Sequence, residues 1–262
     1  MNKIFLSFAL FLATIAAAAQ NGAIIEFKIT STQGASGNVK GYYSAGNSRV
    51  EMQMNIPQMP AAGFSRTSIV KSDKPLTVYA LNEKNKTYTT TEVKQDPTTS
   101  TNTNEYSVKI VGKEKVGIYN CIHAIVTATR TTGTQSNEFW TTTEITDYEK
   151  FAKNAGENKF MGTGSEYAAL VKAGAAGFIV KSLTKDPRGG EFTMELVKIE
   201  KKEIAASTFQ IPTDYKLSAT PASPVGGIDI NKLQSMTPEE RAKYIEEMKK
   251  QYGAPPTPPK QN

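Results

Sequence analysis

The sequence predicts a mainly β protein of the α+β class, built as a large curved antiparallel sheet or unclosed half-barrel of about ten strands with a helical lid and an added C-terminal helix. Three observations predict this class: alternation of apolar and polar residues from Ile24 onward, short polar turns between the alternating runs, and one Ala- and Lys-rich interruption two-thirds of the way along. The chain has 262 residues, of which 39% are hydrophobic and 21% charged. This composition is typical of globular proteins.

Residues 20–218 form the predicted β domain. In the run from Ile24 to Thr30 apolar side chains alternate with Glu26 and Lys28, as expected for a strand with one buried face. Gly46 and Asn47 predict a tight hairpin, and Asn82–Lys86 predicts a polar turn between two strands. Further strands are expected in NVKGYYS, SRVEMQMNI, EYSVKIVG, VGIYNCIHAIVTATR, NEFWTTTEI, GFIVKSLTKD, EFTMELVKIEKKEI and STFQIPTDY.

The interruption between Thr146 and Gly174 predicts helix. The stretches TDYEKFAKNAG and SEYAALVKAGAAG show no alternation, and each ends at glycine. They are typical of one or two short helices, for which Thr146 and Ser165 are the candidate N-terminal caps. We expect these helices to cover one face of the sheet as a lid.

Both ends of the chain differ from the β domain. Residues 1–19 have the features of a secretory signal peptide: Lys3, an apolar stretch from Ile4 to Ile15, and Ala17 and Ala19 in cleavage-site spacing. We expect export to the periplasm, with an extracellular location as the alternative. No cysteine lies near the cleavage site for a lipid anchor, and no later stretch is long and apolar enough for a transmembrane span in the mature chain.

The C-terminal part is predicted as a Pro/Gly linker at 219–235, a helix at 236–253 and a disordered Pro-rich tail at 254–262. Thr237 is the expected N-cap of the helix, and Glu240 completes a capping box with it. The apolar stripe of this helix is narrow, so weak docking on the domain and binding of another envelope protein both stay open.

The only cysteine and the only histidine, Cys121 and His123, lie two positions apart. On a strand they share a face, so a nucleophile pair is conceivable. Their neighbours on that face are mostly apolar, however, which favours core packing. We therefore predict no catalytic residue, no metal site and no cofactor. The net charge of +6 is spread along the chain without a basic cluster, so nucleic acid is not an expected partner.

Apolar side chains offer the remaining candidate site. Met52–Phe64 is rich in methionine, whose flexible side chain adapts to varied apolar partners. Either it plugs the core or it lines a rim that meets an apolar ligand. The residues expected to line the concave face of the sheet or its rim are Phe27, Tyr43, Met52, Met54, Met59, Phe64, Val78, Phe139, Phe178, Phe192 and Met194.

The chain resembles a known family of bacterial secreted proteins, the domain of unknown function DUF4412. The resemblance lies in the runs EFKIT, GNVKGYYSAGNSRVEMQM, VYALNEKNKTYTT, VGIYNCIHAIVTAT, EFWTTTEI and TFQIPTDY, and it covers about residues 24–216. The order of elements is also similar to that of the periplasmic lipoprotein carrier LolA. This resemblance implies an unclosed antiparallel barrel with a helical lid over an apolar cavity. A Gly-Tyr-x-Cys-like segment of the domain family corresponds to Gly117–Cys121 and favours a packing role for Cys121.

Two functions stay open at this point. The first is a non-enzymatic periplasmic protein that binds a lipid, an acyl chain or a lipoprotein in a half-barrel cavity. The alternative is an envelope interaction module with a filled core, which binds another protein through its C-terminal helix. An enzyme is the remote third interpretation. A hollow concave face favours the first function, and a face filled by large side chains favours the second.

Overall fold

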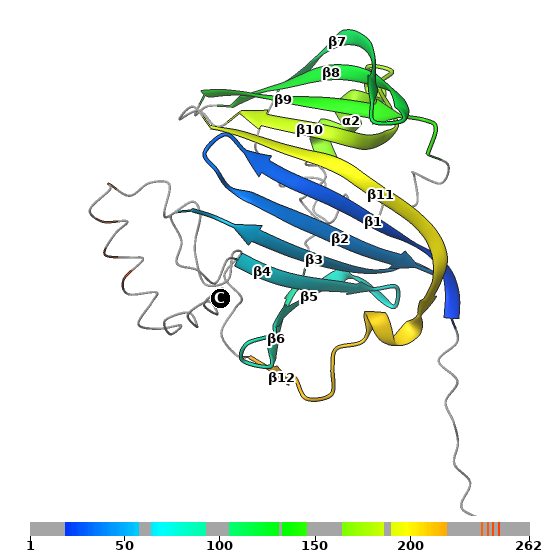
Figure 1. Cartoon of the computed structure of the whole chain (residues 1–262), viewed down its shortest axis with the longest axis vertical. Helices are drawn as coiled ribbons and strands as arrows, with labels where there is room; N and C mark the ends of the chain where they lie inside the picture. Colours follow the sequence, from blue (N-terminus) through cyan, green and yellow to red (C-terminus); the bar gives the residue numbers. More distant parts are fainter. Residues whose placement is uncertain are drawn as a thin grey trace, which may run out of the picture.

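A computed structural model describes residues 19–57, 64–92, 105–130, 133–145, 164–185 and 190–218, together with Thr237, Glu240, Lys243 and Glu246. This part forms one twelve-stranded sheet in the order β12-β6-β5-β4-β3-β2-β1-β11-β10-β9-β8-β7 (Figure 1). The strands are β1 (Ala19–Ser31), β2 (Ser36–Ser44), β3 (Asn47–Asn55), β4 (Phe64–Lys71), β5 (Lys74–Asn82), β6 (Thr87–Glu92), β7 (Glu105–Val116), β8 (Tyr119–Arg130), β9 (Gly133–Thr142), β10 (Phe178–Lys185), β11 (Glu191–Ala205) and β12 (Lys216–Leu217).

The sheet is curved and unclosed, which confirms the predicted fold class. β7 and β12 are its two ends, and every neighbouring pair is antiparallel except β12 and β6. Figure 1 shows the long β11 bending strongly beside β1. Irregular pairing occurs between Glu26 and Phe27 of β1 and between Ile179 and Lys181 of β10. Such bulges bend a strand locally, and here they occur where β10, β11 and β1 adjoin.

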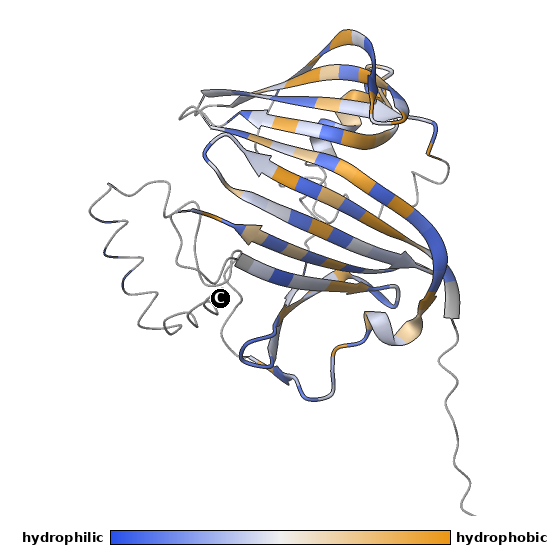
Figure 2. Cartoon of the chain, in the orientation of Figure 1, coloured by the Kyte–Doolittle hydropathy of each residue, from blue (hydrophilic) through white to orange (hydrophobic). Residues whose placement is uncertain are grey.

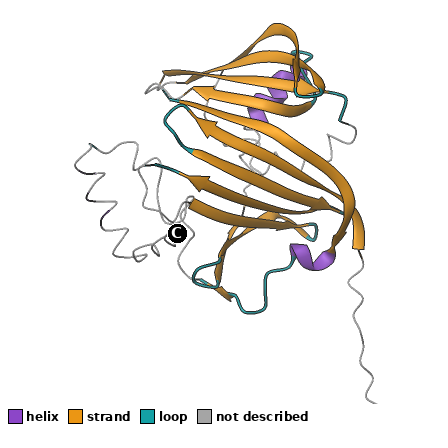
Figure 3. Ribbon diagram, viewed as in Figure 1, coloured by secondary structure: helices purple, strands orange, loops and turns teal. Residues whose placement is uncertain are grey.

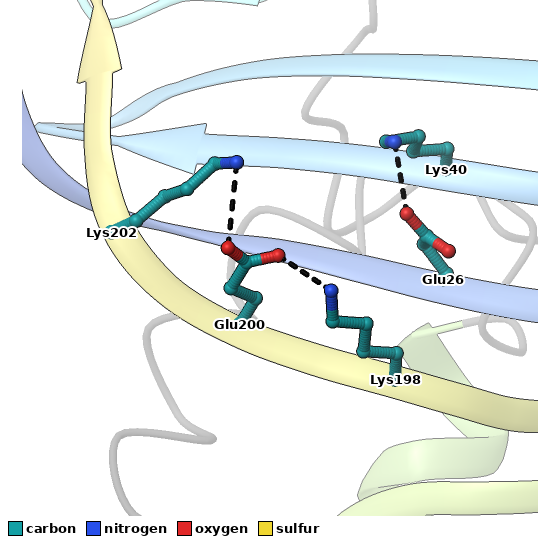
Figure 4. A network of polar contacts seen from close by, with 5 residues as sticks. All are labelled: Glu26, Lys40, Lys198, Glu200 and Lys202. Atoms are coloured by element: carbon teal, nitrogen blue, oxygen red, sulfur yellow. Dashed lines mark hydrogen bonds and ion pairs between the residues drawn. The ribbon is translucent and has the colours of Figure 1, made fainter.

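The outer face of the central strands is charged. Lys198 lies opposite Glu26, Glu26 opposite Lys40, and Lys40 opposite Glu51, so charges of alternating sign cross four strands. Lys40 Nζ lies 2.9 Å from Glu26 Oε1, and Glu200 lies between two lysines of β11 (Figure 4). Figure 2 shows the alternation of hydrophilic and hydrophobic residues along these strands. Because cross-strand partners share a face, the outer face is suited to water and the inner face holds the apolar residues.

The segment after β11 covers part of the outer face. The 3₁₀-helix η2 (Ala206–Phe209) places Phe209 against Ile24 and Ile204, and farther along Ile211 and Tyr215 pack with Ile69. The prediction of a strand over STFQIPTDY was therefore wrong. Its apolar side chains pack on the sheet instead of extending it, and Pro212 has no N–H to donate to a ladder. Only the short β12 pairs, in parallel with β6.

Two turns differ from the expected positions. The hairpin between β2 and β3 has Ala45 and Gly46 at its tip, with φ of 47° and 80°, rather than Gly46 and Asn47. Asn47 instead donates from Nδ2 to the Ser44 carbonyl, 3.2 Å away. Val116 ends β7, and the turn at Gly117 and Ile118 divides the run that was predicted as one long strand. Gly117 has a φ of 57°, in the left-handed region where glycine has no steric penalty.

The helix α2 (Gly164–Lys172) lies within the predicted lid region and packs against β7 and β8 (Figure 3). It begins at Gly164, one residue before the predicted cap Ser165. Its first turn carries the buried Glu166, whose Oε1 accepts a 2.9 Å hydrogen bond from Asn137 Nδ2. The other predicted helical stretch, within residues 146–163, lies outside the described residues.

The predicted C-terminal capping box is confirmed at the residues that the structure describes there. The Thr237 amide donates to Glu240 Oε2 at 2.8 Å, and the Glu240 amide donates to Thr237 Oγ1 at 3.3 Å. Glu240, Lys243 and Glu246 are helical. The remainder of 219–262 lies outside the described residues, so the linker and tail stay predictions.

A substitution at Gly177, which lies between α2 and β10, tests how closely the chain packs against β9 at this point. It has a φ of 155°, and an added Cβ would lie 2.7 Å from the Thr142 carbonyl oxygen. We expect Gly177→Ala to lower the free energy of unfolding by about 1–3 kcal/mol because backbone strain and a backbone clash add. Gly112→Ala is the control, since nothing lies within 4 Å of its added Cβ, and it should change stability by less than about 0.5 kcal/mol. Urea unfolding measures both, and equal effects would contradict the packing described.

Candidate functional site

The inner face carries a continuous row of side chains across the sheet. By register, Met54 lies opposite Gly37, Gly37 opposite Ile29, and Ile29 opposite Met194. Met194 in turn lies opposite Ser182, and Ser182 opposite Phe139. Partners directly opposite in an antiparallel pair share a face. The register therefore aligns residues that are up to 165 positions apart in the sequence, as Ile29 and Met194 are, and most of these residues are apolar.

The largest apolar cluster lies on this face of β1, β2, β3 and β11. Phe27, Met52 and Met194 are 6%, 5% and 9% exposed, and Phe178 packs with them. The Phe27 and Phe178 rings are stacked, with centroids 6.2 Å apart and planes inclined by 12°. Phe178 precedes the bulge of β10, beyond the Lys181–Lys185 stretch that pairs with β11. Four of the predicted residues are thus in one cluster.

Phe139 lies apart from that cluster. It packs with Ala124, Val126 and Leu170, so the described helix α2 covers Phe139 rather than Phe27. The adjacent Trp140 points to the other side of β9 and belongs to the Phe27 cluster. β9 is therefore buried on both sides, by α2 on one and by the large cluster on the other.

The remaining predicted residues occupy the margins of the inner face. Tyr43, Met54 and Phe192 are half-buried and pack against the Phe27 cluster. Burial raises the pKa of Tyr43 to about 12, so its phenol stays neutral. Val78 lies opposite Val70 on β4 and is also half-buried. Phe64 is opposite Met54 in the register, and Met59 lies outside the described residues.

The predicted site left out several members of the cluster. Ile25, Ile29, Val39 and Val50 are buried within it, and strand alternation had already identified them as apolar-face positions. Trp140 and Cys121 could not have been found that way, because their strands are separated from β1 by β10 and β11. Their contact with the cluster depends on the course of β10, which the sequence pattern does not reveal.

Cys121 and His123 serve packing, as the sequence predicted. Cys121 is 2% exposed, its Sγ lies 3.7 Å from the Tyr119 carbonyl oxygen, and burial raises the pKa of its thiol. His123 stacks on Trp140 with ring centroids 4.2 Å apart, and its Nε2 lies 2.9 Å from Glu138 Oε2. The imidazole is therefore engaged with the neighbouring strand, and the higher thiol pKa disfavours a thiolate nucleophile.

Polar groups surround Trp140 on β7–β10. Lys181 Nζ lies 4.6 Å from the Trp140 ring centroid, and the indole N–H donates to Glu114. Glu138 accepts from Lys185 Nζ at 2.9 Å, and this hydrogen bond is the main cause that lowers the pKa of Glu138, with His123 contributing. These contacts satisfy the polar edge of a mostly buried aromatic ring. They hold β8, β9 and β10 together at the border of the large cluster.

Neither a metal cluster nor a membrane-spanning helix occurs in the described part of the chain. No three His, Cys, Asp or Glu side chains among the described residues group as metal ligands would. Within the same residues, no helix has the length and hydrophobicity needed to cross a bilayer.

Comparison with known proteins places residues 22–215 in a family. The family model of the domain of unknown function DUF4412 matches this range, and no curated protein matches the chain. Solved structures that match include a DUF1329 family protein from Desulfovibrio piger, with 9% identity, a TM-score of 0.29, and coverage of 73% of this chain and 90% of that one. Another is a domain assigned by name to outer membrane lipoprotein sorting, from Vibrio parahaemolyticus, with 9% identity, a TM-score of 0.28, and coverage of 73% and 89%. Neither likeness bears on what this chain binds.

The packing role of Cys121 predicts slow thiol chemistry. Iodoacetamide should modify Cys121 in the native protein on the order of a hundredfold more slowly than in urea, because the thiol is buried and poorly ionised. His123→Gln is the control variant and should leave the native rate unchanged if it folds normally. A fast native reaction that His123→Gln slows would instead show a reactive pair.

Glu138 predicts a pH dependence of stability. The pKa of this carboxyl is held below its ordinary value of 4.5, so its ion contacts stabilise the folded state fully above that pH. The contribution is lost as the pH falls through the lower folded pKa. Stability should therefore fall less steeply below about pH 4.5 in Glu138→Gln than in the wild type, as measured by urea midpoints. Glu105→Gln, at an exposed position on β7, should retain the wild-type slope. If stability depended on pH with the same slope in all three proteins, the contribution assigned to the Glu138 carboxylate would be contradicted.

Proposed function

We propose that this protein, which belongs to the DUF4412 family, is a non-enzymatic envelope protein that binds an apolar ligand on the inner face of its sheet. The ligand class is a lipid or an acyl chain, either free or carried by a lipoprotein. The signal-peptide features of residues 1–19 support export to the periplasm. The proposed ligand-binding residues are those that the sequence predicted. Among them, Phe27, Tyr43, Met52, Met54, Phe178, Phe192 and Met194 belong to the inner-face cluster or pack against it, and Met59 lies outside the described residues.

The extent of the apolar inner face carries this proposal. On β1, β2 and β3 the inner-face positions from Ala23 to Met54 are apolar, aromatic or small. Tyr43, Met54 and Phe192 are only half-buried at its margins, so apolar surface continues outward from the buried cluster. A ligand that covers such surface gains about 25 cal/mol per Å² of apolar area removed from water, less the cost of ordering.

Methionine and glycine give the margin a shape that can adapt. An added Cβ on Gly37 would lie 2.9 Å from Met54 Cγ, so the methionine side chain lies across the glycine. Gly41 is similarly covered by the ring of Tyr43, whose Cε2 would lie 2.5 Å from an added Cβ. Flexible methionine beside exposed backbone can repack when an apolar chain enters.

A second candidate function is an envelope interaction module with a filled core. The stack of Phe27 on Phe178 and the nearly complete burial of Met52 favour it, because large side chains already occupy this part of the inner face. The capping box of Thr237 and Glu240 gives the C-terminal helix a defined start for contacting a partner.

Native mass spectrometry of the mature protein, purified from the periplasm with lipids retained, separates the two functions. The ligand-binding function predicts a stoichiometric adduct of lipid or acyl mass that organic extraction removes. A mass equal to that of the protein alone, still unchanged after incubation with envelope lipids, would contradict the ligand-binding function. The interaction module predicts this unchanged mass. It also predicts that the protein captures a partner protein and that deletion of residues 226–262 abolishes this capture.

A matched pair of variants places the ligand on the inner face. Met54→Asp puts a charge on the half-buried margin, while Gln53→Asp puts the same charge on the exposed outer position beside it. We expect Met54→Asp to lower ligand occupancy by about tenfold or more because a carboxylate disfavours an apolar contact. Gln53→Asp should bind as the wild type does. Equal occupancy in both variants would exclude this face as the site.

A further inference from the structure

A row of small side chains, the small-residue row, crosses the inner face near the β6 end of the sheet. By register, Thr89 of β6 lies opposite Ala80 of β5, and Ala80 lies opposite Ser68 of β4. These three side chains are buried, with 8%, 9% and 4% exposure. The two described helices pack elsewhere, because α2 contacts β7 and β8 and η2 covers the outer face of β3 and β4. Side chains this small cover little of one another, so their burial requires a further layer on this face.

Thr89 indicates independently what this layer must offer. Its Oγ1 is buried and has no hydrogen-bond partner among the described residues. A buried hydroxyl without a partner is costly, and most such groups in proteins are therefore satisfied. The covering element should accordingly bring a polar group to Thr89 in addition to apolar side chains.

The C-terminal helix carries both features. Its apolar stripe consists of Tyr244, Ile245, Met248 and Tyr252. Two of these residues are tyrosines, whose phenols can donate a hydrogen bond to a hydroxyl oxygen. Lys243 and Glu246 are helical and exposed, and by helical spacing they lie on the side away from the stripe. Because the polar side of the helix is exposed, the apolar stripe is the side available for packing.

The position at which the C-terminal part leaves the sheet favours this face. The Ser218 amide donates to the Tyr88 carbonyl oxygen at 2.8 Å, so residue 219 starts beside β6. Eighteen residues separate Ser218 from Thr237, enough to span roughly 60 Å when fully extended, whereas the small-residue row spans only about 10 Å. The outer face next to β6 already holds Ile211 and Tyr215. A tethered helix is present at a high effective concentration, so a narrow stripe suffices for docking.

We propose that the C-terminal helix docks on the inner face of its own domain, with its apolar stripe packed on Thr89, Ala80 and Ser68. The occupant of this face is thus a segment of the same chain, and a tyrosine phenol supplies the partner of the Thr89 hydroxyl. This inference does not rest on ligand binding. It bears on the interaction module, because the same stripe cannot hold another protein while it is docked.

Iodoacetamide labelling of Thr89→Cys in the delipidated full-length mature protein tests the inference. The substitution keeps a small side chain and removes the unpartnered hydroxyl. With the stripe intact, the new thiol should react slowly. Replacing Ile245 and Met248 together by Asp should raise its rate about tenfold or more, because buried carboxylates disfavour an apolar contact and release the helix. Peptide mass mapping separates this label from any on Cys121.

Matched variants control for charge and for the face that is probed. Lys243→Asp makes the same change of two charges on the exposed side of the helix, and it should leave the rate of Thr89→Cys unchanged. Thr90→Cys, exposed at the next position on the outer face, should react equally fast with and without the stripe substitutions. If Thr89→Cys fails to fold, Ser68→Cys probes the same row and should respond in the same way.

Each other result would overturn the inference. An equally slow reaction of Thr89→Cys with the intact and the substituted stripe would show that a different element covers the row. A reaction as fast as that of Thr90→Cys in every chain would show that nothing covers it. A rise produced equally by Lys243→Asp would reduce the effect to net charge.

Discussion

The stacking of Phe27 on Phe178 joins parts of the sheet that do not pair with each other. Phe27 belongs to β1 and Phe178 to β10, and β11 lies between these strands in the sheet. The contact occurs where β10 no longer pairs with β11, and a bulge follows directly in β10. Without this course of the chain, Trp140 and Cys121 would not reach the Phe27 cluster. Phe178, Trp140 and Cys121 therefore join the largest core of the domain near the place where the pairing of β10 is irregular.

The two faces of the sheet have different roles because their side chains differ in charge. On the outer face, Lys198, Glu26, Lys40 and Glu51 alternate in sign across the strands, which suits contact with water. The inner-face positions of β1, β2 and β3 from Ala23 to Met54 are apolar, aromatic or small.

Cys121 and His123, which lie two positions apart on β8, are each engaged in contacts of the core or its border. The thiol lies inside the large cluster, while the imidazole stacks on Trp140 and contacts Glu138. Both side chains therefore contribute to the border between the cluster and the helix-covered part of the sheet.

The sequence by itself determined the fold class, the positions of most strands and the inner-face membership of Phe27, Tyr43, Met52 and Met194. It could do so because alternation is a local property: each strand shows which of its side chains face the core. The capping box at Thr237 is equally local, and it too was predicted correctly.

Tertiary structure alone decided three features. First, Phe139 packs under α2, while Trp140 belongs to the Phe27 cluster. Second, the segment STFQIPTDY, which was predicted as a strand, covers part of the outer face. Third, Arg66 lies opposite Met52. The first and third features depend on a bulge or on register, which are set by the packing of strands far apart in the sequence. The second depends on the apolar side chains that Phe209, Ile211 and Tyr215 meet on the outer face. A shift of one residue exchanges the two faces of a strand, and no local pattern records which strand lies beside it.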